Sequence, residues 1–140
     1  MRAILIDPVE RTVSEVEYSG SSKDIYRLVD CETFTVVGIE HDDAIFVDDE
    51  GLLKDDPRYY FIYRGHDQPI AGKGLVLGTD SEGESVEPVS TVDDIKVAVR
   101  FVELKLEGFK DVEGTIDHPL LGPNTPYFGH HPVFSKREEQ

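Results

Sequence analysis

The sequence of 140 residues contains one cysteine, one methionine and no tryptophan. A single cysteine excludes an intramolecular disulfide framework, which stabilises many small secreted domains. We therefore expect a soluble protein of a reducing compartment, the cytoplasm. No apolar run approaches the roughly 20 residues that a membrane-spanning helix needs. The first apolar run meets Asp7 and Pro8, too early for a signal peptide, so no membrane association is predicted.

Basic residues are also scarce, with 14 Lys and Arg against 29 Asp and Glu, a formal net charge of -15. Nucleic-acid binding begins when basic side chains neutralise phosphates, so direct binding to nucleic acid is not expected. Hydrophobic residues make up 39% of the chain. The acidic residues lie between short apolar runs, a pattern that favours a folded domain with an acidic surface over a disordered acidic tail.

Hydrophobic periodicity predicts an α+β fold built on a mainly antiparallel sheet. The first fifty residues have a β-β-α-β-β pattern. A hairpin is expected from the apolar run 3–6 and the alternating run 12–18, followed by a short helix that begins after Ser21. A second hairpin is expected from residues 33–39 and 44–47.

The rest of the chain predicts further strands and one more helix. Strands are expected at the aromatic residues 58–64 and at the glycine-punctuated residues 68–78, and a second helix at residues 92–102. We interpret residues 1–107 as a single α+β domain. Residues 108–140 are rich in Gly, Pro and His and are expected to form an irregular C-terminal arm or tail.

Carboxylates gather at both ends of the predicted strand 44–47. The candidate partner-binding residues are Asp42, Asp43, Asp48, Asp49 and Glu50. Several interpretations stay open: a solvated surface that favours solubility, or a negative face that either meets a basic partner protein or imitates the phosphates of DNA. In an antiparallel sheet the two clusters would lie at opposite ends, which weakens the hypothesis of a single patch.

The glycine-rich residues 72–78 suggest nucleotide binding, but the pattern is incomplete. A Walker-type loop precedes a helix, whereas here a strand is expected to continue and Lys73 is followed by Gly74 instead of Ser or Thr. A bulged or twisted strand is the alternative. A looser hypothesis is a pocket for an anionic small molecule such as a nucleotide. Its candidate residues are Arg64, Gly72, Lys73 and Gly74.

The histidines supply a further hypothesis, a metal-dependent enzyme. His41 and His66 each precede an aspartate at a predicted strand end, and they are the candidate metal ligands. Their spacing matches no common zinc pattern. Cys31 follows a predicted helix C-terminus, where the helix dipole disfavours a thiolate. We assign no catalytic residue and no cofactor.

Three segments, residues 1–8, 46–51 and 68–74, follow one another in order around the β-β-α opening. Together they resemble a family of small domains of unknown function that are encoded by phages, plasmids and bacterial genomes. The similarity covers about residues 1–102. The resemblance implies an accessory protein of a mobile element or its host, and it supplies no catalytic residues.

The leading hypothesis is therefore a non-enzymatic acidic accessory protein, of a phage or mobile element, that binds a host or phage protein. A defence factor or a nucleic-acid-handling factor would suit this role. The alternatives are the binder of an anionic small molecule and the metal-dependent enzyme. Homo-oligomerisation stays open.

Overall fold

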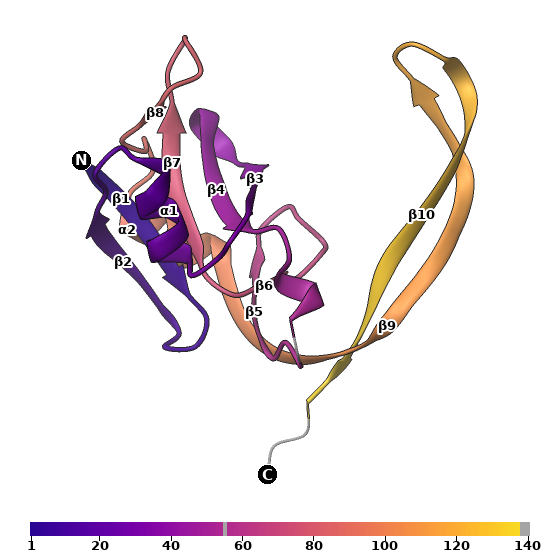
Figure 1. Cartoon of the computed structure of the whole chain (residues 1–140), viewed down its shortest axis with the longest axis horizontal. Coiled ribbons are helices and arrows are strands. Elements are labelled where there is room, and N and C mark those ends of the chain that lie inside the picture. Colours follow the sequence, from indigo (N-terminus) through magenta and orange to yellow (C-terminus); the bar gives the residue numbers. More distant parts are fainter. Residues whose placement is uncertain (55, 138–140) are drawn as a thin grey trace. The chain divides into compact units, whose positions relative to one another are not determined.

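The computed structural model describes residues 1–54 and 56–137. The chain divides into two units, Met1–Glu103 and Leu104–Gln140, and each is described by itself (Figure 1). The first unit contains two helices and antiparallel strands, which confirms the predicted α+β class. None of the helices in the described residues is long and apolar enough to cross a membrane.

The main sheet of the first unit has six strands. They lie in the order β2-β1-β7-β4-β3, with β8 beside β7, and every neighbouring pair is antiparallel. The strands are β1 (Arg2–Asp7), β2 (Thr12–Glu17), β3 (Phe34–Gly38), β4 (Asp43–Asp48), β7 (Gly74–Thr79) and β8 (Ser85–Val86). The central strand β7 is buried on both faces, which explains its nearly continuous apolar sequence.

A smaller sheet is built on β5 (Tyr59–Tyr63). This strand pairs with β6 (Ile70–Ala71) and with Val99–Glu103, the first residues of β9 (Val99–His118). Two short 3-10 turns, η1 (Glu40–Asp42) and η2 (Gly51–Leu53), lie before and after β4.

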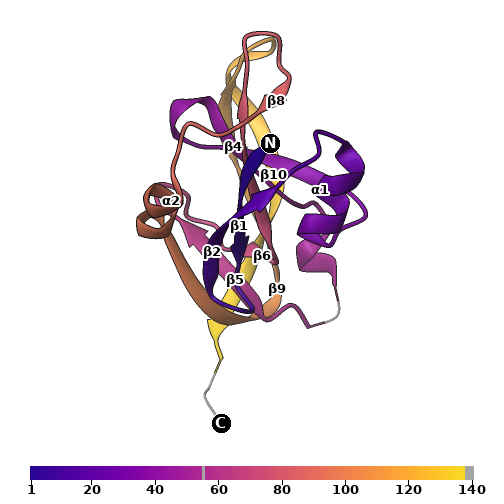
Figure 2. The ribbon, with the colours of Figure 1, turned by 90° about the vertical axis from the view of Figure 1, so that its left-hand side faces the viewer.

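The two helices, α1 (Ser22–Val29) and α2 (Val92–Ala98), lie on opposite faces of the main sheet (Figure 2). Ser21 caps α1, because its hydroxyl accepts a hydrogen bond from the Lys23 amide at 3.3 Å. Thr91 and Asp94 form a reciprocal capping box at the start of α2.

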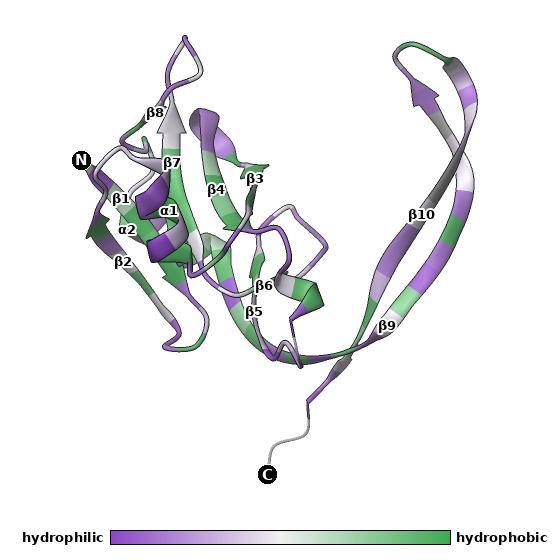
Figure 3. Cartoon of the chain, viewed as in Figure 1, coloured by the Kyte–Doolittle hydropathy of each residue, from purple (hydrophilic) through white to green (hydrophobic). Residues whose placement is uncertain are grey.

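Each face of the main sheet has its own apolar core, in line with the concentration of hydrophobic residues on the inner strands in Figure 3. The α2 face contains Ile4, Ile6, Val13, Ile45, Val47, Val76, Ile95 and Ala98, together with Phe61 and Tyr63 from β5. The α1 face contains Ala3, Tyr18, Ile25, Val29, Leu75 and Leu77. Leu75 and Leu77 therefore face α1, while Val76 between them faces α2, as the alternation of a strand requires.

The predicted second helix is too long at its C-terminal end. The helix stops at Ala98, and Val99 is already extended, with φ -105 and ψ 136. Val99 opens β9 and pairs with Tyr63 of β5. β-branched and aromatic residues after Ala98 suit a strand, and the pairing with β5 overrides their helical spacing.

The prediction of an irregular C-terminal arm is also wrong. From Leu104 onward, β9 pairs antiparallel with β10 (Gly122–Lys136), in a register that runs from Leu104–Lys136 to His118–Gly122. Nδ1 of His118 accepts hydrogen bonds from the amides of Leu120 and Leu121, at 3.0 Å each, and these bonds stabilise the turn between β9 and β10. The prolines of β10 are tolerated because each strand of a two-stranded ribbon has an edge without backbone partners.

Candidate functional site

Asp42 and Asp43 are adjacent in sequence but occupy different environments. Asp42 is exposed, whereas Asp43 is only 2% exposed. The Asp43 carboxylate accepts hydrogen bonds from the amides of Val89 and Ser90, at 3.0 and 2.8 Å. The prediction of Asp43 as a partner-binding residue is therefore wrong: its side chain joins the connection before α2 to the sheet. His41 and Asp42 both have positive φ, and this turn directs Asp43 inward.

At the other end of β4, two acidic segments converge. A depression of about 410 Å³ is lined by Asp30, Cys31, Glu32, Asp48, Glu50 and Lys54. We call Asp30, Glu32, Asp48, Asp49 and Glu50 the acidic corner. The amide of Asp49 donates to the carbonyl of Thr33 at 3.1 Å, which ties the loop after β4 to the loop after α1.

Lys54 is the basic residue of this corner. Its Nζ lies 2.8 Å from Oδ2 of Asp48 and donates to the carbonyl of Asp30 at 3.2 Å. The hydrogen bond to Asp48 raises the pKa of Lys54, so the ion pair is firmly charged. Asp48, whose side chain is 5% exposed, is thus neutralised locally, while Asp49 and Glu50 stay exposed.

The acidic corner does not activate the neighbouring thiol. Burial raises the pKa of Cys31, and the negative charge of Asp48 raises it further. A thiol nucleophile is activated by a lowered pKa, so the surroundings of Cys31 disfavour its thiolate.

The four residues of the small-anion hypothesis are only partly brought together. Gly72, with φ +84, and Lys73 line one pocket. Gly74 is buried, and a Cβ there would lie 2.7 Å from Ile45, so this glycine serves packing. Arg64 does not line that pocket; its guanidinium lies 3.7 Å from a carboxylate oxygen of Glu40.

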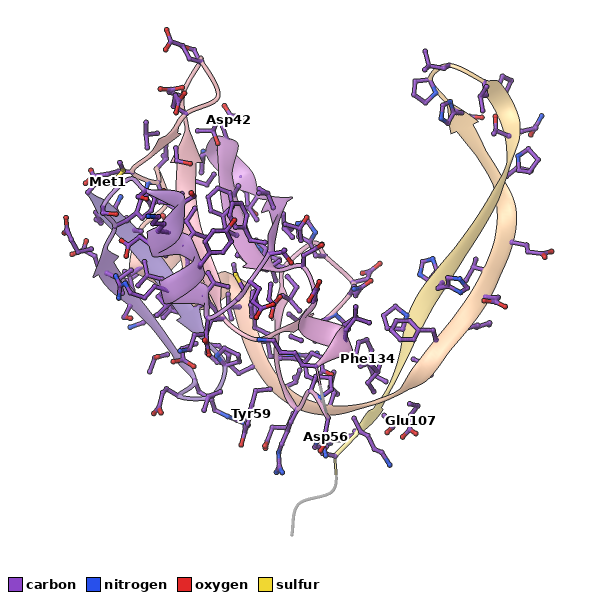
Figure 4. All side chains as sticks on the ribbon, viewed as in Figure 1. Met1, Asp42, Asp56, Tyr59, Glu107 and Phe134 are labelled. Carbon is purple, nitrogen blue, oxygen red and sulfur yellow. The ribbon has the colours of Figure 1, made fainter. Side chains whose placement is uncertain are left out.

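The pocket that contains Lys73 has a volume of about 230 Å³, and we call it the Lys73 pocket. Its lining residues are Val9, Val29, Asp30, Asp48, Gly51, Lys54, Pro57, Arg58, Tyr59, Ala71, Gly72 and Lys73. Tyr59 and Asp42 lie at opposite ends of the first unit (Figure 4). The pocket therefore lies at the end of the sheet that carries the acidic corner. Sequence reasoning missed Lys54 and Arg58, because only the folded chain brings their loops to Lys73.

The two candidate metal ligands have different surroundings. His66 packs edge-on against the ring of Tyr63 at 6.0 Å between centroids, and His41 is exposed in η1. In the part of the chain that the structure describes, no group of three or more His, Cys, Asp and Glu side chains has an arrangement that could hold a metal ion.

Comparison with known proteins yields one relative and a family. The chain is 28% identical over 98 residues to the "Uncharacterized protein y4iR" of Sinorhizobium fredii (strain NBRC 101917 / NGR234), an alignment that covers 68% of this chain. The chain spans 60% of the length of that relative. No solved structure matches the chain. The model of the family described as a domain of unknown function (DUF3846) matches residues 1–101, and the chain therefore belongs to this family, in agreement with the resemblance in its sequence.

Proposed function

We propose that the chain is a non-enzymatic binding protein whose acidic corner holds a basic segment of a partner protein. The observation that supports this function best is the convergence of two acidic segments, Asp30–Glu32 and Asp48–Glu50, around one depression. An accessory role for a phage or mobile element, with a host or phage protein as the partner, is part of the same proposal.

The acidic corner attracts a basic partner more strongly than any single carboxylate does. One exposed ion pair contributes only about 0.2–1 kcal/mol. Several carboxylates within one Debye length, about 8 Å at physiological salt, reinforce one another and speed the approach of a basic partner. Lys54 compensates Asp48, so the exposed negative charge comes from Asp30, Glu32, Asp49 and Glu50.

Asp42 belongs to a different surface. It precedes β4, whose six residues span about 20 Å at roughly 3.3 Å per residue. At that end of the sheet Asp42 lines a depression with Asp80, and the turn that follows carries Glu82 and Glu84. These two glutamates are exposed and provide a matched control for the acidic corner.

The test reverses two charges at each end of the sheet. The double variant Asp49→Lys/Glu50→Lys changes the acidic corner, and Glu82→Lys/Glu84→Lys changes the opposite end. Each variant carries the same net charge of -11, since every reversal adds two charges to the -15 of the chain. Both pairs are exposed, so both variants should fold.

Affinity capture of the full chain, quantified by mass spectrometry, compares the two variants with the wild-type protein. We expect the first variant to lose the basic protein that the wild type captures, and the second to retain it. Equal capture by all three chains would contradict the proposed role of the acidic corner. Equal loss in both variants would also contradict it, because the capture would then depend on the net charge alone.

A further inference from the structure

We propose that the Lys73 pocket binds a small amphipathic carboxylate, with an apolar body against the pocket walls and one negative charge at Lys73. This inference goes beyond the proposed protein-binding function and concerns a different ligand.

The walls of the pocket are mainly apolar. Val9, Val29, Pro57 and Ala71 line it, and Tyr59, 37% exposed, adds an aromatic ring. Gly51 packs tightly against the wall residue Ala71, since a Cβ at position 51 would lie 3.0 Å from the carbonyl oxygen of Ala71. The volume of about 230 Å³ is below the 300–1,000 Å³ that is usual for drug-sized ligands. The pocket therefore suits a small ligand with an apolar body.

Three cations line the pocket, and two of them already have partners. Lys54 is paired with Asp48 at 2.8 Å, and Arg58 with Glu103 at 2.7 Å. The guanidinium of Arg58 also lies 5.7 Å from the ring centroid of Tyr59, a cation–π contact. Both cations are thus held as parts of the wall.

Lys73 is different. Among the described residues it has no ion-pair partner, although 29 of the 140 residues are acidic. It is partly buried, and it follows the left-handed turn at Gly72 that leads from β6 to β7. A partly buried ammonium without a counter-ion attracts an anion more strongly than an exposed one, because the local dielectric constant is lower.

Charge counting indicates a ligand with a single negative charge. The cations that line the pocket are Lys54, Arg58 and Lys73, and the carboxylates that line it are Asp30 and Asp48. These three positive and two negative lining groups leave an excess of one positive charge, which a carboxylate matches. A polyphosphate would meet Asp30 and Asp48 as like charges.

The probes separate the apolar body from the charge. Benzoate carries both, benzyl alcohol carries the ring without the charge, and inorganic phosphate carries charge without an apolar body. Titration of the full chain is followed by amide resonances in two-dimensional NMR. We expect benzoate to shift the resonances of Ala71, Gly72 and Lys73 saturably, with a Kd of about 1 mM for a ligand of this size. Benzyl alcohol should bind roughly tenfold more weakly, because it lacks the charge-assisted bond.

Two variants assign the contacts. Lys73→Gln keeps a polar side chain with part of the aliphatic stem and removes the charge, and it should weaken benzoate binding roughly tenfold. Lys96→Gln, an exposed residue of α2, is the matched control and should leave binding unchanged. Val9 is 54% exposed, so Val9→Ser should fold normally and weaken binding by about threefold through lost apolar contact.

The proposal is overturned if benzoate produces no saturable shifts at these residues, if phosphate binds as tightly as benzoate, or if Lys73→Gln binds benzoate like the wild type. Asp49 and Glu50 do not line the pocket. The variant Asp49→Lys/Glu50→Lys therefore tests the acidic corner separately, and either proposal can fail while the other stands.

Discussion

Replacement of Asp43 by Asn should destabilise the fold far more than the same replacement at Asp42. Each carboxylate oxygen of Asp43 accepts one hydrogen bond, Oδ1 from the amide of Val89 and Oδ2 from the amide of Ser90. A hydrogen bond to a charged group contributes about 1.5–3 kcal/mol. Asn keeps one acceptor, but its NH₂ group then faces an amide donor. We therefore expect the free energy of unfolding to fall by about 2–3 kcal/mol.

Asp42→Asn is the matched control, because the chemical change is identical. Asp42 is exposed and has a φ of 60°, a conformation that Asn adopts readily. The expected change is within about 0.5 kcal/mol. Urea unfolding, followed by near-ultraviolet circular dichroism of the buried residues Tyr18, Tyr60 and Tyr63, measures both variants. Similar unfolding free energies for the two variants would refute the inward role of Asp43.

Two further predictions concern Gly74 and the start of α2. Gly74→Ala should lower the free energy of unfolding by about 1–3 kcal/mol through overpacking, because its Cβ would lie 2.7 Å from Ile45. Gly38→Ala is the control: a Cβ there meets open space, so the change should be nearly neutral. Urea unfolding midpoints compare the two variants. The amide of Thr91 lowers the pKa of Asp94 below 3.8 on folding. This carboxyl therefore stabilises the fold above that pH and stops doing so as the pH falls through the lowered pKa. The urea midpoints of wild type and Asp94→Asn should thus differ in neutral buffer and converge in acid; a constant difference would contradict the assignment.

Elements with local signals were predictable from the sequence. The start of α1 after Ser21 follows from a hydroxyl that satisfies a free amide of the first turn, and Thr91 acts in the same way for α2. The antiparallel character of the sheet followed from alternating runs joined by tight turns. Such signals act within a few residues, so no knowledge of the folded chain was needed.

Elements that depend on distant pairing were not predictable. Val99 and Val102 have helical spacing relative to Ile95, and only their pairing with β5 makes them a strand. The ribbon likewise joins Leu104 to Lys136, far apart in sequence. Gly, Pro and His in this segment suggested irregular backbone, but composition does not reveal that a complementary strand lies opposite.

The residues of the candidate site also divide into features that the sequence reveals and features that depend on the folded chain. Clusters of Asp and Glu near β4 were visible in the sequence, yet their directions were not. A left-handed turn at His41 and Asp42 decides that Asp43 points inward. The approach of Glu32 to Glu50 depends on the pairing of β3 with β4, which joins segments that sequence reasoning treated separately.

Composition alone is a poor guide to where this protein attracts charge. A net charge of -15 suggests that every anion is repelled, but local pairing alters the field at each surface. Lys54 and Arg58 are neutralised by Asp48 and Glu103, so neither attracts a ligand strongly. Among the described residues Lys73 has no ion-pair partner, and at short range its ammonium outweighs the carboxylates outside the pocket, which salt screens. The two proposals thus place opposite ligand charges at one end of the sheet, a basic partner at the acidic corner and a small carboxylate in the adjoining pocket.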